Sequence, residues 1–84
     1  MDLELAGKVA IIGGGSKGLG RACAEVLAQE GAKLTLCSRT AADLHQAAEE
    51  IRRETNADIL EFPGDLDDPE TITALVAATV ERFG

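Results

Sequence analysis

The chain has 84 residues and a mass of 8.8 kDa, which limits it to one small domain with a marginal core. Apolar residues make up 45% and charged residues 27% of it, a composition typical of a globular chain rather than a disordered one. The formal net charge of −7 argues against a nucleic-acid partner, because a surface that meets phosphates needs an excess of positive charge.

No targeting or membrane signal stands out. No apolar stretch approaches the length needed to cross a bilayer, and the acidic first residues lack the pattern of an export signal. Cys23 and Cys37 form no C-x-x-C motif, so we expect two free thiols that pack as small apolar side chains in a reducing compartment. The sequence therefore favours a cytoplasmic protein without a membrane partner.

The first predicted unit is a strand, a glycine-rich turn and a helix. The apolar run at residues 8–12 is closed by glycines, which is typical of a strand covered on both faces in a parallel sheet. The turn at residues 13–18 follows. Helical spacing then predicts a helix with one buried stripe, which comprises Leu19, Ala22, Cys23, Val26 and Leu27. Gly31 fits the residue just past the end of this helix.

The second and third units repeat this order. A strand at 33–38 precedes a helix that Thr40 and Asp43 are expected to open as a capping box and Asn56 to end. A strand at 59–62 precedes a helix that Asp68 caps, with Pro69 in its first turn. The stripes predicted to be buried are Leu44, Ala47, Ala48 and Ile51 in the second helix, and Ile72, Leu75, Val76, Thr79, Val80 and Phe83 in the third.

Strands that alternate with helices of this length predict an α/β fold with a Rossmann-type parallel sheet, β-α-β-α-β-α, the first half of a doubly wound domain. In the strand order 3-2-1-4 the first strand is central. If the chain ends at Gly84, that strand becomes an exposed apolar edge. The first two helices should then cover one face of the sheet and the third helix the other.

The glycine-rich turn is the segment with a clear chemical implication. A glycine turn between a strand and a helix lets the backbone approach a pyrophosphate at the free amides of the helix. Two registers fit: Gly13, Gly15 and Gly18 match G-x-G-x-x-G, while Gly14, Gly18 and Gly20 match G-x-x-x-G-x-G. The phosphate loop G-x-x-x-x-G-K-[ST] fails, because Lys17 precedes Gly18.

Residues 9–20, VAIIGGGSKGLG, resemble the T-G-x-x-x-G-x-G cofactor signature of the short-chain dehydrogenase/reductase family. Residues 36–39, LCSR, and 64–66, GDL, match the ends of that family's second and third strands. The resemblance implies that Gly14, Gly18 and Gly20 shape the turn, that Ser16 and the Leu19 amide meet the ribose and pyrophosphate, and that Asp65 and the Leu66 amide meet the adenine. Gly13 stands where the family usually has Thr, which puts the bracing of the turn in doubt.

The end of the second strand indicates the choice of cofactor. Sites that prefer NAD usually place Asp or Glu there, whereas this chain has Ser38, Arg39 and Thr40 and no acid before Asp43. A guanidinium suits a 2′-phosphate, and Lys17 is the second cation that the family places near it. We therefore expect NADP(H) to be preferred over NAD(H), with hydroxyls of Ser38 and Thr40 as further donors.

Simpler interpretations stay open for several of these residues. Arg39 and Lys17 could be solvated charges, Ser16 a helix cap, and Asp65 the start of an acidic turn with Asp67 and Asp68. His45 has no partner in the sequence and is expected to be a surface residue. Glu49 and Glu50 do not face each other on a helix, so they are expected to be surface charges rather than a catalytic pair. The sequence indicates no metal site.

The family's reaction transfers hydride between nicotinamide and a carbonyl or alcohol, using a Tyr, a Lys and a Ser. This chain has no Tyr, and its serines, Ser16 and Ser38, belong to the cofactor half. We therefore expect residues 1–84 to be a partial dinucleotide-binding domain, the N-terminal third of such an enzyme without its catalytic part, inactive alone and a homo-oligomer when complete. The alternative is a standalone nucleotide-binding or interaction module.

Overall fold

The computed structural model describes residues 5–14 and 16–84. Strand and helix alternate three times, as predicted, and the bounds differ from the expected ones by a residue or two. The elements are β1 (Val9–Gly13), α1 (Gly18–Gln29), β2 (Lys33–Ser38), α2 (Ala41–Thr55), β3 (Ile59–Pro63) and α3 (Pro69–Phe83).

The three strands form one parallel sheet in the order β1-β2-β3, so β2 is central. Val9 pairs with Lys33 and Gly13 with Cys37, while Ser38 pairs with Pro63. The carboxyl ends of all three strands consequently lie at one edge. This arrangement confirms the predicted Rossmann-type α/β architecture.

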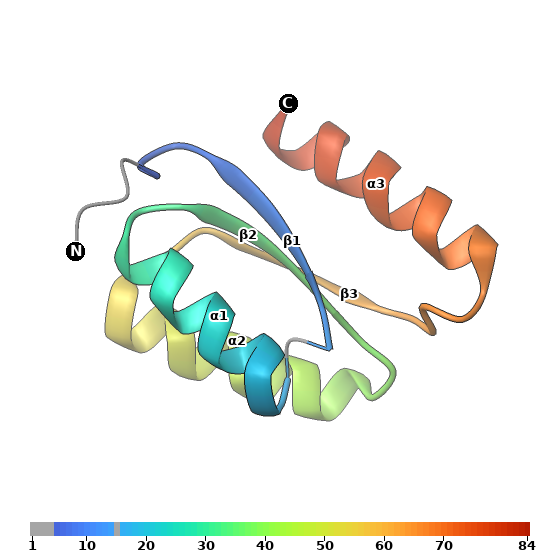
Figure 1. Cartoon of the computed structure of the whole chain (residues 1–84), viewed down its shortest axis with the longest axis horizontal. Helices are drawn as coiled ribbons and strands as arrows, with labels where there is room; N and C mark the ends of the chain where they lie inside the picture. The colour runs from blue at the N-terminus through green and yellow to red at the C-terminus, as the bar shows by residue number, and fades with distance from the viewer. Residues whose placement is uncertain (1–4, 15) are drawn as a thin grey trace.

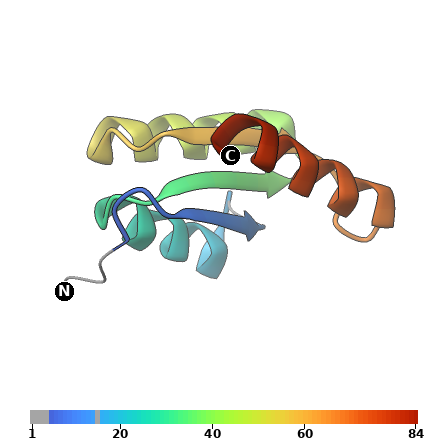
Figure 2. The same cartoon turned by 90° about the horizontal axis from the view of Figure 1, so that it is seen from above.

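Two helices cover one face of the sheet and one helix covers the other, as expected (Figures 1 and 2). On the first face α1 contacts β1 and β2, and α2 contacts β2 and β3. The main core lies between this helix pair and the sheet; its fully buried larger members are Leu34, Leu36, Leu44 and Ile51. On the opposite face the hydroxyl of Thr79 in α3 donates to Thr35 Oγ1 of β2 at 2.9 Å.

The ends of the helices follow the predicted signals with one exception. Asp68 accepts a hydrogen bond from the Glu70 amide at 2.9 Å, and Asn56 ends α2 in the left-handed conformation with a φ of 59°. Gly31 follows α1 with a φ of 90°. The capping box at Thr40 is wrong: Thr40 occupies the position before α2, but its side chain makes no capping hydrogen bond.

The predicted buried stripes of α1 and α3 need correction. In α1 the residues buried against the sheet are Ala24 and Ala28, whose small side chains let the helix approach closely, while Leu19 is 81% exposed. Cys23 is exposed as well, so of the two cysteines Cys37 alone packs as a buried apolar group. In α3 only Leu75 and Thr79 are buried, and the exposed members of the stripe are Ile72, Val76 and Val80.

The sheet has two edge strands, β3 and β1, and β1 is the edge that the sequence predicted to be open. Within residues 5–14 and 16–84, β2 is the only strand that pairs with it, and Val9 and Ile11 are 41% and 43% exposed. The expectation of an exposed apolar edge is therefore confirmed for this part of the chain. None of the three helices described is long and apolar enough to span a membrane.

Candidate cofactor site

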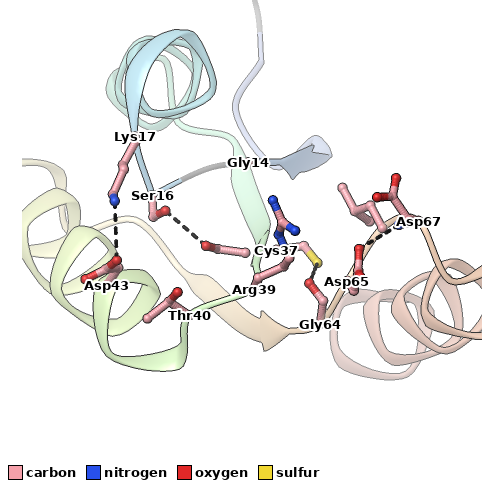
Figure 3. Close-up of a pocket in the computed structure, with 12 residues that line it drawn as sticks. Gly14, Ser16, Lys17, Cys37, Arg39, Thr40, Asp43, Gly64, Asp65 and Asp67 are labelled. Carbon is pink, nitrogen blue, oxygen red and sulfur yellow. Dashed lines mark hydrogen bonds and ion pairs between the residues drawn. The ribbon is translucent and has the colours of Figure 1, made fainter.

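An open pocket of about 420 Å³ lies at the carboxyl ends of the three strands (Figure 3). Open parallel sheets bind their ligands at this edge. The glycine turn, the β2–α2 connection and the β3–α3 connection form its walls. Its lining residues are Gly14, Ser16, Lys17, Cys37, Ser38, Arg39, Thr40, Asp43, Gly64, Asp65, Leu66 and Asp67.

The backbone of the turn requires its glycines. Gly14 and Gly18 have φ values of 67° and 59°, which L-residues with a Cβ rarely adopt. A Cβ on Gly20 would lie 2.5 Å from the carbonyl oxygen of Gly14, so α1 packs directly on the turn. Gly15 lies outside the described residues, and the register that uses it stays untested.

Hydrogen bonds attach the glycine turn to the end of β2. The Gly14 amide donates to the Cys37 carbonyl at 2.9 Å, and the hydroxyls of Ser16 and Ser38 lie 3.0 Å apart in a shared hydrogen bond. Lys17, not Ser16, occupies the capping position of α1, so the interpretation of Ser16 as a helix cap is wrong. The amide of Leu19 belongs to the first turn of α1, where helical N–H groups have no intrahelical acceptor.

Two cations enter the pocket from different elements. Arg39 and Thr40 follow β2 and are exposed, and Figure 3 shows the Arg39 side chain extending into the pocket. The ammonium of Lys17 lies 3.6 Å from the carboxylate of Asp43, which stands in the first turn of α2. None of the ion pairs among the described residues involves Arg39, so its charge is open to a ligand.

The third wall of the pocket follows β3. The Gly64 amide donates to the Ser38 carbonyl at 2.9 Å, and the Cys37 thiol contacts the Gly64 carbonyl at 3.7 Å. Asp65 is exposed, and one of its carboxylate oxygens accepts the Asp67 amide at 2.9 Å. The acidic turn and a ligand contact are thus compatible, because Asp65 Oδ2 forms no such bond within the turn.

The side chain of Leu66 lies beside Gly13, the position that departs from the family signature. A Cβ on Gly13 would fall inside the van der Waals distance of Leu66 Cδ1, so a larger residue at this position would require the partly exposed Leu66 side chain to move. The sequence assigned a role only to the Leu66 amide. The unusual glycine was the signal that could have pointed to the leucine side chain.

The profile of the family described as short chain dehydrogenase matches residues 8–84. The chain belongs to the short-chain dehydrogenase/reductase family. It is 42% identical to an uncharacterized oxidoreductase of Bacillus subtilis, over 96% of this chain and 28% of that protein. It is 39% identical to L-rhamnose-1-dehydrogenase of Scheffersomyces stipitis, over 95% of this chain and 32% of that protein. The chain thus spans about a third of the length of these relatives.

Solved structures of this family superpose closely. L-sorbose reductase from Gluconobacter frateurii, complexed with NADPH and L-sorbose, matches with a TM-score of 0.96 and 39% identity over 100% of this chain and 32% of that one. A family member from Burkholderia phymatum, in complex with NAD, matches with a TM-score of 0.91 and 34% identity over 98% and 29%.

A charged cluster lies on α2 and β3, outside the pocket residues. The Arg52 guanidinium donates to Glu49 and Glu61 at 2.7 Å each, and His45 Nδ1 lies 2.9 Å from Glu61. His45 is a surface residue as expected, but it does have a partner. One ligand atom each of His45, Glu49 and Glu61 lies within 4.8 Å of the others, a spacing that could suit a metal, but both carboxylates already pair with Arg52.

The two glutamates that adjoin in α2 have different partners. Arg21 of α1 donates to Glu50 at 2.6 Å and to Glu25 at 3.0 Å, whereas Glu49 pairs with Arg52. The hydrogen bond from Arg21 lowers the pKa of Glu50 below its usual value. Glu50 therefore joins α2 to α1, whereas the partner of Glu49 lies in its own helix.

Proposed function

We propose that this chain binds NADP(H) and forms the cofactor-binding segment of an oxidoreductase. The observation that carries the proposal is the pocket, in which a glycine turn at the start of α1 faces the same space as the Arg39 guanidinium, which forms no ion pair with a described residue. Family membership supports it, and the structurally similar L-sorbose reductase was solved with NADPH.

The glycine turn and the start of α1 suit the pyrophosphate. The left-handed glycines bring the backbone to the pocket without side chains in the way, and the first turn of α1 offers amides and the positive end of the helix dipole. In this assignment Ser16 and the Leu19 amide donate to ribose and phosphate oxygens. The hydrogen bond to Ser38 fixes the Ser16 hydroxyl at the rim of the pocket.

The side of the pocket after β2 suits a 2′-phosphate. Residues 38–40 offer two hydroxyls and a guanidinium, and the ammonium of Lys17 enters from the glycine turn. A carboxylate at the end of β2 would repel the phosphate, and this chain has none there. On the opposite wall, Asp65 Oδ2 and the Leu66 amide suit the adenine edge, so the adenosine would lie across the carboxyl ends of β2 and β3.

When bound, the nicotinamide supplies the hydride donor or acceptor for a carbonyl or alcohol substrate. This chain would hold the cofactor and would not catalyse the step, because it has no tyrosine to serve as the acid or base. We propose that a catalytic part follows in the complete protein, because relatives are about three times as long and β1 has an open edge. A homo-oligomer in the cytoplasm fits this proposal.

The test uses the protein expressed from its complete gene. Calorimetric titrations measure how tightly it binds NADPH and NADH. A charged hydrogen bond to the 2′-phosphate contributes about 1.5–3 kcal/mol. We therefore expect the dissociation constant for NADPH to be at least about tenfold lower than that for NADH. Equal binding, tighter binding of NADH, or binding of neither cofactor would contradict the proposal.

A further inference from the structure

Asp43 is an acidic residue on the side of the pocket that carries the cations. It stands in the first turn of α2, and its carboxylate lies 3.6 Å from the ammonium of Lys17, across the gap between α1 and α2 (Figure 3). Asp43, Lys17 and Arg39 all line the pocket. The Lys17 ammonium is therefore already paired with a carboxylate where a phosphate would need it.

We propose that Asp43 is a specificity-determining residue that limits the preference for NADPH. This inference rests on the proposed function, because it assumes that the 2′-phosphate lies beside Arg39 and Lys17. A phosphate monoester carries about −1.5 to −2 charges at pH 7, so a carboxylate on the same side of the pocket opposes it. Asp43 also competes with the phosphate for Lys17, since one ammonium cannot be fully shared between two anions.

Because the ion pair between Lys17 and Asp43 is exposed, we expect its loss to affect cofactor binding rather than the stability of the fold. The side chains of Lys17 and Asp43 are 79% and 43% exposed, so water screens the ion pair and the fold gains little from it. Asp43 stands in the first turn of α2, where an exposed carboxylate contributes only about 0.3–1 kcal/mol through the helix dipole. Replacing the carboxylate by an amide of the same shape should therefore leave the structure intact.

The experiment compares Asp43→Asn with wild type in the protein expressed from its complete gene, by calorimetric titration with NADPH and NADH. Removing one screened charge should strengthen NADPH binding about three- to tenfold and change NADH binding by less than about twofold. The gain should shrink as ionic strength rises, because salt screens the repulsion. Circular dichroism checks that the variant keeps the fold.

Asp67→Asn is the matched control, because Asp67 lines the same pocket from the opposite wall after β3. It removes an equal charge, and it should change the NADPH-to-NADH ratio less than Asp43→Asn does. A second comparison uses Lys17→Gln: in that background the gain from Asp43→Asn should fall by at least half. An undiminished gain would contradict the competition for Lys17.

The outcomes separate this inference from the proposed function. A wild type that prefers NADPH, with a further rise in that preference for Asp43→Asn, supports the inference. If the wild type prefers NADPH but Asp43→Asn leaves the ratio unchanged or lowers it, the role of Asp43 is wrong and the proposed function stands. A wild type that prefers NADH or binds neither cofactor overturns the proposed function, and the inference with it.

Discussion

A Cβ atom on Gly20 would lie 2.5 Å from the carbonyl oxygen of Gly14, which joins the first turn of α1 to the glycine turn through backbone contact alone. Gly20→Ala must therefore push α1 away from the turn. We expect it to weaken NADPH and NADH binding by similar factors of at least about tenfold, because pyrophosphate contacts depend on sub-ångström placement of the backbone. Titration with both cofactors checks this.

Gly18→Ala is the contrasting variant. Among the described residues beyond its own neighbours in the helix, its Cβ would meet no atom within 4 Å, so the substitution costs mainly the left-handed backbone conformation, about 1–2 kcal/mol of the free energy of unfolding. If Gly20→Ala bound both cofactors as well as wild type does, the packing of α1 on the turn would not matter for the site.

The charged cluster on α2 and β3 predicts a pH-dependent contribution to stability. Partial burial raises the pKa of Glu61, but hydrogen bonds from Arg52 and His45 outweigh that effect and hold the pKa below its usual value. Glu61→Gln should lower the free energy of unfolding by about 1 kcal/mol at pH 7. Because the folded-state pKa is depressed, this loss should disappear as the pH falls from about 4.3 through the lower folded value.

Urea unfolding of the complete protein at several pH values measures this effect. Glu54→Gln serves as the control, because Glu54 lies exposed on the same helix and its side chain forms no hydrogen bond or ion pair with any residue that the structure describes. A difference between Glu61→Gln and wild type that stayed constant down to pH 3 would show that the carboxylate charge plays no part.

The sequence predicted the order of the elements because each signal was local, and their alternation then implied parallel pairing of the strands. Apolar runs, Asp68 with Pro69, and Asn56 each specify a strand or a helix end within a few residues. The prediction of the buried face of α1 was wrong for a physical reason. Periodicity shows that a helix has an apolar face, but Ala24 and Ala28 form a second, smaller face that packs closer to the sheet. In α3 the burial of Leu75 and Thr79 was predicted correctly, and the burial of their apolar neighbours in the stripe was not.

The candidate site, like the fold, could be predicted only in part from the sequence. The glycines and the residues after β2 could be assigned one by one from the resemblance. The pairing of Lys17 with Asp43 and the contact of Leu66 with Gly13 could not, because they join segments that are far apart in the sequence. Both depend on how the connections fold over the edge of the sheet.

The two thiols should differ strongly in reactivity. Cys23 is exposed on α1, whereas Cys37 is buried, and burial raises the pKa of the Cys37 thiol above its usual value. A thiol-reactive dye at pH 7.5 should modify Cys23 quickly and Cys37 only after unfolding, since the thiolate is the reactive form. Cys23→Ser should remove the fast phase, and a fast phase that survived this substitution would contradict the burial of Cys37.

Residues 1–84 expressed alone should aggregate or lack a cooperative fold. The open edge of β1 exposes Val9 and Ile11, and the outer face of α3 exposes Ile72, Val76 and Val80. Size-exclusion chromatography with light scattering and a thermal scan check this expectation. A monodisperse monomer that unfolds cooperatively would show that these surfaces need no cover.

Arg39 is the residue on which the assignment of the cofactor depends most. Its guanidinium lines the pocket, and no ion pair among the described residues involves it. The decisive measurement is a titration of wild type and Arg39→Ala, in the protein expressed from its complete gene, with NADPH and with NADH. We predict that Arg39→Ala weakens NADPH binding about ten- to a hundredfold and NADH binding far less, because only NADPH carries the 2′-phosphate. Equal losses for the two cofactors, or no loss for NADPH, would contradict the account.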